Sequence, residues 1–430
     1  MDRVIRKAKA LKGEITPPAD KSISHRAVMF ACLANGQSRI KNFLWAKDPI
    51  SSLTAMRSLG ADIQITKSKE IIVNGMGLHS LKEPENVIDC GNSGTTIRLL
   101  SGILAGQPFL SILTGDDSLR QRPMRRIIEP LRLMGANIMG RAENKLPPLV
   151  IKGGSLKGIN YNMPIASAQV KSAILLAGLF AEGESSVTEP YKSRDHTEKM
   201  LKSMGVELKI NNNTIKITPP RHPLKPFDIT IPNDFSSAAF FIAGALLVPD
   251  SEVIIRNVCL NETRTGFIEV LKSMNANIEI FNLREQAREP VGDILVKTVS
   301  ALKAVTVQGE IIPRLIDEFP VLCIVATQAE GTTVIKDAKD LRAKESDRIK
   351  AMTTELSKMG VLIKEFEDGV EIKGPCRLKS AEVYSYKDHR IAMALSIAAL
   401  IAEAETVIKH TECVDISFPE FYNLLEMLQR

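Results

Sequence analysis

Leu131-Arg132-Leu133-Met134-Gly135-Ala136-Asn137-Ile138 recurs with small changes at five places in this chain of 430 residues. In every copy a glycine or asparagine follows the end of a helix-like segment, and these hinge residues are Gly60, Gly135, Gly205, Asn275 and Gly360. Such a residue ends a helix in the left-handed conformation, and the alternating residues after it are typical of a half-buried strand. Each copy therefore predicts a helix, a tight turn and a strand, repeated about every seventy residues.

A sixth helix of this kind, residues 418–428, runs to the end of the sequence with no strand after it. Its partner strand must then come from elsewhere, and residues 3–15 are the candidate. This predicts that the two termini lie in the same domain.

A second type of helix recurs with the same period and is apolar on nearly all sides. It is expected at residues 22–34, 95–105, 167–181, 236–247, 317–329 and 388–403. A helix without a polar face belongs in the interior, whereas the charged helices before the hinges need a solvent face. Buried apolar helices with sheets outside them are the expected arrangement.

Six units are too many for one core, and proline-marked segments at residues 17–20 and 231–234 are candidate crossovers. We expect an α/β fold with two inside-out barrel domains, each made of three pseudo-symmetric units. The first domain would span residues 20–234, and the second would combine 1–19 with 235–430. The cleft between them is the expected ligand site.

Composition restricts the function classes. No apolar segment reaches the roughly 18–20 residues that span a bilayer, and the N-terminus lacks the apolar core of a secretory signal. A cytoplasmic protein without a membrane span is expected.

The six cysteines are far apart and form no metal-ligand pattern. The net charge is +6, but without a basic tract and with 5% aromatic residues it favours small anions over nucleic acid.

Reactive residues gather where the apolar helices begin, and helix N-termini bind phosphates and carboxylates. The first helix starts Asp20-Lys21-Ser22-Ile23-Ser24-His25-Arg26, where Ser22 could cap the helix and Arg26 lies one turn further. Lysine, hydroxyl and arginine could then surround one anion. An ordinary capped surface helix is the alternative.

Two more segments carry the same signal in the second unit. Gly91-Asn92-Ser93-Gly94-Thr95-Thr96-Ile97-Arg98 is a glycine-rich loop that lacks the Gly-Lys-Ser/Thr ending of a nucleotide P-loop. Residues 118–126 contain four arginines, among them Arg122 ahead of a proline. A plain turn and a solvated charge run are the respective alternatives.

Later segments mix acids and bases. Ser167-Ala168-Gln169 opens the third apolar helix, although simple capping explains Ser167 equally well, and Arg194 follows the corresponding strand. Further along come Asp317-Glu318, Arg342-Ala343-Lys344-Glu345-Ser346-Asp347-Arg348 and Asp388-His389-Arg390. This interleaving suggests proton transfer beside anion binding, with a salt-bridged helix start as the alternative.

Taken together and in this order, these motifs resemble those of the 5-enolpyruvylshikimate-3-phosphate synthase family, also called 3-phosphoshikimate 1-carboxyvinyltransferases. The resemblance rests on residues 20–26, 91–95, Arg122-Pro123, 342–348, 388–390 and Ser417-Phe418-Pro419, and it extends over essentially the whole chain. It implies transfer of the enolpyruvyl group of phosphoenolpyruvate to the 5-hydroxyl of shikimate 3-phosphate, with release of phosphate, in the shikimate pathway to chorismate and aromatic amino acids. The fold it implies agrees with the repeat.

The resemblance also implies binding residues. Contacts to shikimate 3-phosphate are expected from Lys21, Ser22, Arg26, Ser167, Ala168, Gln169, Arg194, Asp317 and Lys344. Contacts to phosphoenolpyruvate are expected from Lys21, Asn92, Gly94, Arg122, Gln169, Arg348 and Arg390.

The implied reaction is an addition followed by an elimination, and it needs one base and one acid. As a hypothesis, Asp317 accepts the hydroxyl proton, Glu345 protonates the methylene carbon, and Lys21 assists the departing phosphate. His389 is a further candidate for proton transfer. Neither a metal nor an organic cofactor is expected, and a monomer is expected.

Two positions depart from the most common form of the family. Ala168 replaces a serine, and Ile416 stands where many members carry a lysine. In this family glyphosate competes for the phosphoenolpyruvate pocket, and Gly94 matches the glycine of sensitive members, but Ile416 leaves sensitivity open.

Two rival functions fit parts of the sequence. One is the sister enolpyruvyl transferase acting on UDP-N-acetylglucosamine, but Thr114–Arg126 lacks its loop cysteine and Lys21 is not followed by its asparagine. The other is a nucleic-acid-binding repeat protein, which would need basic surface stripes with interleaved aromatic residues.

Overall fold

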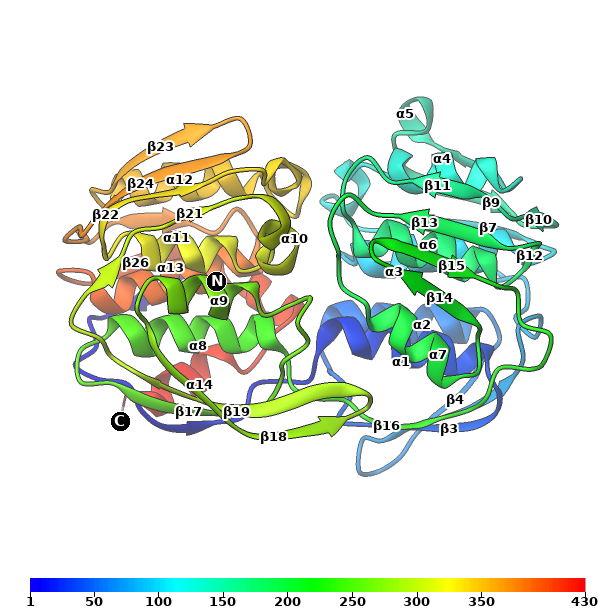
Figure 1. The fold of residues 1–430 in the computed structure, drawn as a ribbon, viewed down its shortest axis with the longest axis horizontal. Coiled ribbons are helices and arrows are strands. Elements are labelled where there is room, and N and C mark those ends of the chain that lie inside the picture. Colours follow the sequence, from blue (N-terminus) through cyan, green and yellow to red (C-terminus); the bar gives the residue numbers. More distant parts are fainter. Residues whose placement is uncertain (430) are drawn as a thin grey trace. The chain divides into compact units, whose positions relative to one another are not determined.

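The computed structural model describes residues 1–429, and the chain forms two compact units. One unit comprises Ala19–Ile231, and the other combines Met1–Pro18 with Pro232–Arg430 (Figure 1). We describe each unit by itself and call them the middle unit and the terminal unit.

The middle unit contains three four-stranded sheets of one design, ordered β16-β3-β5-β4, β6-β7-β9-β8 and β11-β13-β15-β14. In each sheet the first strand is parallel to the second, and the other pairs are antiparallel. The strands are β3 (Asn35–Lys41), β4 (Asp62–Ile65), β5 (Ile71–Met76), β6 (Ile88–Asp89), β7 (Leu110–Thr114), β8 (Asn137–Gly140), β9 (Leu146–Lys152), β11 (Asn160–Asn162), β13 (Ser185–Thr188), β14 (Leu208–Asn211), β15 (Thr214–Ile217) and β16 (Asp228–Thr230). A short parallel pair joins β10 (Leu156–Lys157) to β12 (Ala181–Glu182).

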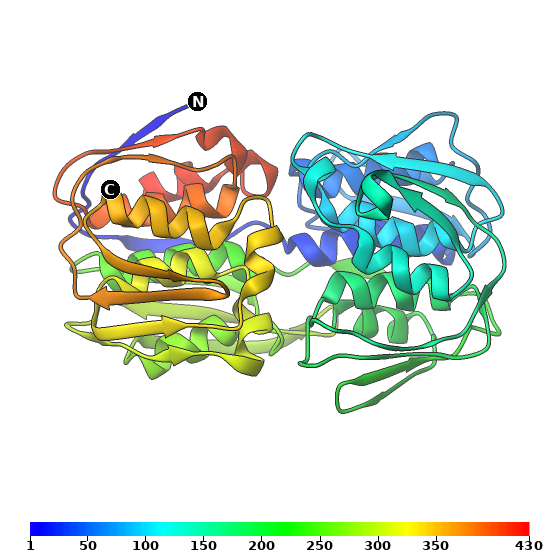
Figure 2. The ribbon, with the colours of Figure 1, turned by 90° about the horizontal axis from the view of Figure 1, so that it is seen from above.

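The terminal unit repeats the design in the sheets β2-β17-β19-β18, β20/β21-β22-β24-β23 and β25-β26-β1. The strands are β1 (Arg3–Ile5), β2 (Lys12–Ile15), β17 (Glu252–Cys259), β18 (Asn277–Gln286), β19 (Glu289–Lys297), β20 (Leu302–Lys303), β21 (Thr306–Val307), β22 (Ala329–Ile335), β23 (Leu362–Phe366), β24 (Gly369–Gly374), β25 (Glu382–Tyr384) and β26 (Thr406–Lys409). The three-stranded sheet contains both ends of the sequence, because β1 pairs antiparallel with β26. Residues 3–5 therefore supply the missing partner strand, and both chain ends are marked on this unit in Figure 2.

Residues 12–15, which were also expected to supply the partner strand, do not join this sheet. β2 lies parallel to β17 in a different sheet of the terminal unit, although it directly precedes the first helix of the middle unit. Conversely, β16 directly precedes α8 (Phe235–Leu247) of the terminal unit but pairs with β3 in the middle unit. Each of the two segments that connect the units therefore runs from a strand of one unit to a helix of the other.

The expected helix stops are present at all five hinges. Gly60, Gly135, Gly205, Asn275 and Gly360 have φ angles of 80°, 99°, 92°, 68° and 86°. In each case the residue after the hinge donates its backbone N–H to the carbonyl five residues back, as Ala136 does to Leu131 at 3.0 Å. These bonds form the Schellman motif and satisfy a carbonyl that the helix end would leave unpaired.

The helices before these hinges are α2 (Lys47–Ser58), α4 (Arg125–Leu133), α7 (His196–Ser203), α9 (Gly266–Ser273) and α12 (Arg348–Lys358), and the sixth is α14 (Phe421–Leu428).

A Leu-Lys pair that the sequence analysis overlooked accompanies the five hinges. Its lysine N–H donates to the carbonyl of the residue before the hinge, as Lys157 does to Met134 at 2.8 Å. The pairs begin at Leu81, Leu156, Leu224, Leu302 and Leu378, all of them buried.

The apolar helices are α1 (Lys21–Leu33), α3 (Gly94–Ala105), α6 (Ala168–Gly178), α8, α11 (Phe319–Ala326) and α13 (His389–Ile401). Nearly all of their residues are buried. In the terminal unit α8, α11 and α13 contact one another and form the centre of the hydrophobic core. In the middle unit α3 contacts both α1 and α6.

Several helix boundaries differ from the expectation, since α6 ends at Gly178, α11 at Ala326 and α13 at Ile401, two or three residues earlier than expected. Asp317 and Glu318 do not lie inside an apolar helix but between α10 (Ile312–Leu315) and α11, because Pro320 occupies the first turn of α11. The 3-10 turns η1 (Leu119–Gln121), η2 (Gly309–Ile311), η3 (Lys339–Ala343) and η4 (Thr411–Ile416) and the single turn α5 (Arg141–Asn144) complete the elements. Within residues 1–429, every helix is too short or too polar to cross a bilayer.

Candidate functional site

The start of α1 carries the first candidate cluster of the middle unit. Asp20 caps the helix, since its Oδ1 accepts from the N–H of Ile23 at 2.8 Å, so the expectation that Ser22 is the cap is wrong. The hydroxyl of Ser22 instead faces Nη1 of Arg194 at 3.5 Å. Nζ of Lys21 lies 3.0 Å from Oδ2 of Asp48 on α2, an acid that the sequence analysis did not single out.

Arg26 is buried below this cluster, with 3% of its surface exposed. Its guanidinium donates to Oγ1 of Thr197 at 2.7 Å, to Oγ of Ser172 at 2.9 Å and to the carbonyl of Ser22 at 2.9 Å. These contacts tie α1 to α6 and α7. These bonds fix the orientation of the guanidinium beneath Lys21 and Ser22.

The second cluster surrounds the start of α3, where Ser93 caps the helix by accepting from the N–H of Thr96 at 3.1 Å. Gly94 is the first residue of the helix, and two guanidinium groups lie against it. A Cβ placed on Gly94 would be 3.0 Å from Nη1 of Arg98 and 3.3 Å from Nη1 of Arg122. Both arginines are about 95% buried, with exposures of 4% and 5%.

Side chains from two other segments hold these arginines in place. Arg122 donates to Oδ1 of Asn92 at 2.7 Å and to Oγ of Ser118 at 3.2 Å. Arg98 donates to Oε1 of Gln169, whose amide donates in turn to Oγ1 of Thr95 at 2.9 Å. Gln169 is the second residue of α6, next to Ala168 and the capping Ser167. The structure therefore joins Asn92, Gly94, Arg122 and Gln169.

Arg98 belongs to the glycine-rich motif, and the sequence alone assigns it no role. Its position one turn after Gly94 was the available signal, because residues four apart share a helix face. Two buried guanidinium groups at a helix N-terminus provide a strongly positive site that suits a phosphate or carboxylate.

The terminal unit gathers its acids around Arg348, which is 1% exposed at the start of α12. Its Nε lies 2.9 Å from Oδ2 of Asp388, its Nη2 lies 2.7 Å from Oε2 of Glu345, and its Nη1 lies 3.3 Å from Oδ1 of Asp317. Burial alone would lower the pKa of this guanidinium, but the charges of Asp388, Glu345 and Asp317 outweigh it, and the pKa is raised. Arg348 thus brings together two of the expected catalytic carboxylates.

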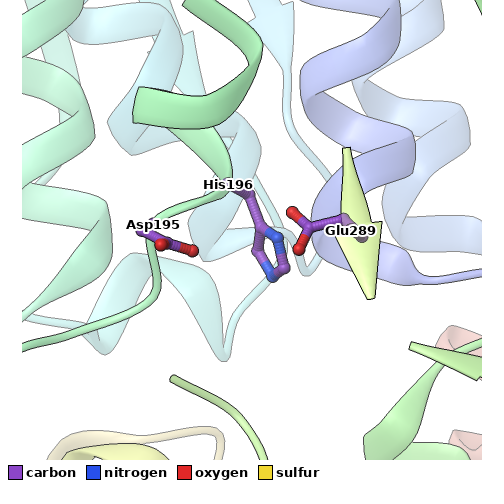
Figure 3. Close-up of side chains that lie close together, drawn as sticks. All are labelled: Asp195, His196 and Glu289. Atoms are coloured by element: carbon purple, nitrogen blue, oxygen red, sulfur yellow. The ribbon is translucent and has the colours of Figure 1, made fainter. Parts of the chain in front are cut away.

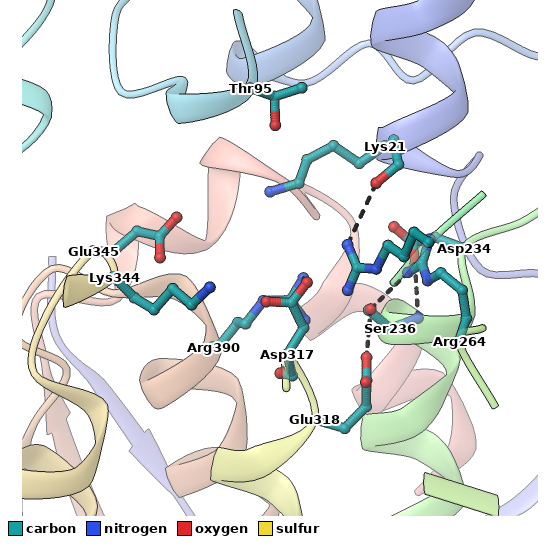
Figure 4. Close-up of polar contacts among 12 residues, drawn as sticks. Lys21, Thr95, Asp234, Ser236, Arg264, Asp317, Glu318, Lys344, Glu345 and Arg390 are labelled. Carbon is teal, nitrogen blue, oxygen red and sulfur yellow. Dashed lines mark hydrogen bonds and ion pairs between the residues drawn. The ribbon is translucent and has the colours of Figure 1, made fainter. Parts of the chain in front are cut away.

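Asp317 also interacts with the last helix of the group. Nη1 of Arg390 donates to the backbone carbonyl of Asp317 at 3.2 Å, and Nη2 lies 3.4 Å from its Oδ2. Figure 4 shows Arg390 beside Asp317 and Lys344 extending toward them. Nζ of Lys344 pairs with Oδ2 of Asp340 at 2.5 Å. Asp317 is therefore a carboxylate that faces two arginines and a lysine.

Two other residues singled out in the sequence belong to the same unit. His389, the first residue of α13, is buried, with 1% of its surface exposed. Ile416 ends η4 and packs against the hydrophobic core of the terminal unit.

Figure 3 shows Asp195 and His196 where α7 begins in the middle unit, and Glu289 at the first residue of β19 in the terminal unit. A protein metal site usually has three or four side-chain ligands, so neither the pair nor the single glutamate makes one by itself. Among residues 1–429, neither unit taken alone brings three His, Cys, Asp or Glu ligands together.

The two units thus hold different chemistry. The middle unit presents Lys21 and four arginines near helix starts, and hydroxyl, amide and carbonyl oxygens and the carboxylate of Asp48 are among their partners. The terminal unit pairs Arg348, Arg390 and Lys344 with carboxylates. The first arrangement suits a multiply charged anion, and the second combines anion binding with groups that can transfer protons.

Comparison with known proteins shows the family. Residues 5–425 match the family model described as EPSP synthase (3-phosphoshikimate 1-carboxyvinyltransferase). A curated 3-phosphoshikimate 1-carboxyvinyltransferase from Thermodesulfovibrio yellowstonii is 79% identical over 430 residues, which cover 100% of both chains.

Solved structures give the same result for the fold. The EPSP synthase from Acinetobacter baumannii has a TM-score of 0.87 and 45% identity, and the match covers 99% of this chain and 98% of that one. The enolpyruvyl transferase NikO from Streptomyces tendae has a TM-score of 0.77 at 15% identity, covering 99% and 96% of the two chains, and shows likeness of fold alone. A mixed α/β fold is common to all three.

Proposed function

The chain belongs to the EPSP synthase (3-phosphoshikimate 1-carboxyvinyltransferase) family, and we propose that the clusters described above bind and convert the substrates of this reaction. The chain is a transferase of the shikimate pathway for aromatic amino-acid biosynthesis. It moves the carboxyvinyl group of phosphoenolpyruvate to shikimate 3-phosphate and releases phosphate. The observation that carries the assignment of residues is the shared contact of Asp317, Glu345 and Asp388 with the buried guanidinium of Arg348.

We assign phosphoenolpyruvate to the groups around Gly94. Arg122, Asn92 and Gln169 would bind one end of this small dianion together with Lys21, and Arg348 and Arg390 of the terminal unit would bind the other. Arg98 joins this set because it lies against Gly94. A bidentate guanidinium suits both the phosphate and the carboxylate of the donor.

Shikimate 3-phosphate is assigned to the start of α1 and α6. Lys21, Ser22, Ser167, Gln169 and Arg194 would hydrogen-bond its phosphate and ring, and Ala168 would offer a backbone N–H. Arg26 would act from below through its charge. From the terminal unit, Asp317 and Lys344 complete the set.

The chemistry follows from the acids. Asp317 accepts the proton of the 5-hydroxyl while the hydroxyl oxygen attacks C2 of the donor, and Glu345 gives a proton to C3. In the elimination C3 returns a proton to Glu345, the C2–O bond to phosphate breaks with Lys21 beside the leaving group, and the proton held by Asp317 leaves with the phosphate. The carboxylates also stabilise positive charge developing at C2. His389, next to Asp388 and Arg390 in sequence, remains a further candidate for proton transfer.

We further propose that the two units are two inside-out α/β barrel domains, residues 20–234 and residues 1–19 with 235–430, and that the active site takes residues from both. The repeated sheet design and the buried apolar helices of each unit support this proposal.

The test is phosphate release from phosphoenolpyruvate by the purified protein, with shikimate 3-phosphate or UDP-N-acetylglucosamine as acceptor. We expect release with shikimate 3-phosphate alone. Release with the nucleotide sugar alone would assign the sister reaction, and no release with either would refute both. Asp317→Asn, measured in the same assay, should abolish turnover if the residue assignment is right.

A further inference from the structure

The interior of the middle unit contains an ionic cluster that the reaction does not use. Nζ of Lys171 on α6 lies 2.7 Å from Oε1 of Glu189 and 2.7 Å from Oε1 of Glu198 on α7. The side chains of these three residues are 1%, 0% and 3% exposed. We call Lys171, Glu189 and Glu198 the buried triad.

Such a cluster is costly to bury, because each charge loses its hydration. One ammonium also cannot neutralise two carboxylates. Burial raises the pKa of the Glu198 carboxyl against the opposing charge of Lys171. Burial would lower the pKa of Lys171, but the two carboxylates outweigh it, and that pKa is raised. Hydrophobic packing would stabilise this position more simply, so the geometry itself needs a reason.

The triad fixes the segment that leads into Arg194. Nζ of Lys171 donates to the carbonyl of Ser193 at 3.2 Å. Oε2 of Glu189 accepts from the backbone N–H of Ser193 at 3.3 Å and from its hydroxyl. Ser193 is thus held at its N–H, its carbonyl and its side chain, and Arg194 is the next residue.

Both ends of the triad lie close in sequence to residues assigned to shikimate 3-phosphate. Lys171 is two residues after Gln169 on the same helix. Arg194 reaches Oγ of Ser22, where α1 begins. The adjacent Thr197 and Ser172 hydroxyls bond to each other at 2.6 Å and accept from Arg26. These polar contacts therefore tie the Arg194 segment to α1 and α6.

We propose that Lys171 is a positioning residue for the phosphorylated acceptor, which acts by fixing Ser193 so that Arg194 is held in place beside Ser22. This inference rests on the proposed function, because it takes Arg194 as a ligand of shikimate 3-phosphate. A solvent-exposed loop would have to immobilise the arginine each time the acceptor binds, and the triad removes that entropic cost.

The experiment compares Lys171→Met, Arg194→Ala and the double variant with the parent, using steady-state kinetics and calorimetric titration with shikimate 3-phosphate. Lys171→Met should raise KM for shikimate 3-phosphate about tenfold, as expected for coupled neighbours, while KM for phosphoenolpyruvate stays within about twofold. In the Arg194→Ala background the same change should have little further effect. Lys202→Met, an exposed Lys-to-Met change on α7, is the matched control.

Three outcomes separate the possibilities. If Arg194→Ala leaves KM for shikimate 3-phosphate unchanged, the proposed role of Arg194 is wrong and the inference fails with it. If Arg194→Ala raises that KM but Lys171→Met does not, only the inference fails. Equal losses from Lys171→Met in both backgrounds would indicate a general structural role and would also overturn it. Should Lys171→Met not fold, Glu189→Gln, which keeps the shape, replaces it in the same cycle.

Discussion

Asp388 bonds to the buried Arg348 and to the first turn of α13 with the same carboxylate. Its Oδ2 lies 2.9 Å from Nε of Arg348, and its Oδ1 accepts from the N–H of Arg390 at 2.9 Å. One side chain therefore aligns the two arginines that we assign to phosphoenolpyruvate. This relationship leads to the first of five predictions.

Asp388→Asn should destabilise the protein by about 2 kcal/mol, because it removes a charge-assisted bond to a buried guanidinium while an asparagine can still cap the helix. Urea denaturation of the parent and the variant measures this difference. Asp117→Asn, which alters an exposed pair with Arg120, should cost less than about 1 kcal/mol. Equal losses from the two changes would contradict the prediction.

Glu345→Gln should lower kcat by about 10²–10⁴ while KM for shikimate 3-phosphate changes little, because it removes the proposed acid and keeps its size. The amide oxygen can still accept from Nη2 of Arg348, which Glu345 now does at 2.7 Å. Phosphate release at saturating substrates measures kcat. Turnover near that of the parent would refute the assignment of Glu345.

Gly94→Ala should raise KM for phosphoenolpyruvate more than KM for shikimate 3-phosphate. The added methyl would lie 3.0 Å from Nη1 of Arg98 and 3.3 Å from Nη1 of Arg122, so both groups must shift by a few tenths of an ångström. Gly154→Ala is the control, since a Cβ there meets no atom within 4 Å. If KM for shikimate 3-phosphate rose selectively instead, the assignment of phosphoenolpyruvate to Gly94 would be wrong.

Glu198 should make its contribution to stability at low pH. Burial raises the pKa of its carboxyl above that of the unfolded chain. The folded state therefore binds the proton more tightly, and the stabilisation is complete below the unfolded pKa of about 4.3 and is lost as the pH rises through the folded pKa. The free energy of unfolding of the parent relative to Glu198→Gln should accordingly fall as the pH rises from about 4 to 8.

The matched control has the opposite sign. Glu184 is exposed, and its bonds to Lys216 and Thr218 lower the pKa of its carboxyl. Stability of the parent relative to Glu184→Gln should rise with pH over the acidic range. Parallel pH profiles for the two variants would show that Glu198 is not the group responsible.

Glu355→Gln should destabilise the terminal unit by about 1–3 kcal/mol, the cost of leaving buried polar groups unsatisfied. This buried carboxylate accepts from the hydroxyl of Tyr386 at 2.6 Å, the N–H of Tyr384 at 3.0 Å and Nζ of Lys358 at 2.7 Å. One amide oxygen cannot replace all three acceptor positions. Denaturant midpoints measure the loss.

Exposed Glu382 serves as the control for Glu355, because it also accepts from a tyrosine hydroxyl, that of Tyr384, at 2.9 Å. Glu382→Gln should change the denaturant midpoint much less than Glu355→Gln does, because solvent screens an exposed carboxylate. A similarly small effect for Glu355→Gln would show that burial of this network contributes nothing.

Local patterns made much of the fold predictable. A glycine or asparagine that must adopt a positive φ marks the end of five helices, and hydrophobicity on all sides marks the buried ones, because both signals depend only on neighbouring residues. The candidate residues at helix starts could be named for the same reason. The grouping of Asp317 and Asp388 around Arg348 could not be read from the sequence, since these contacts join residues that are far apart in the chain. The position of Arg98 against Gly94 could have been expected, because the two residues lie four apart on α3.

The sequence by itself determined the repeat, the helix stops and the family, since short-range sterics and an ordered set of motifs specify them. Tertiary structure alone decided which strand joins which sheet. β2 and β16 each precede a helix of one unit but pair with a strand in the other unit's repeat, because backbone N–H and C=O groups of any extended segment can pair and only the assembled fold selects the partner. It also decided that Asp20, not Ser22, caps α1, because both side chains can accept the bond and only the backbone path chooses between them.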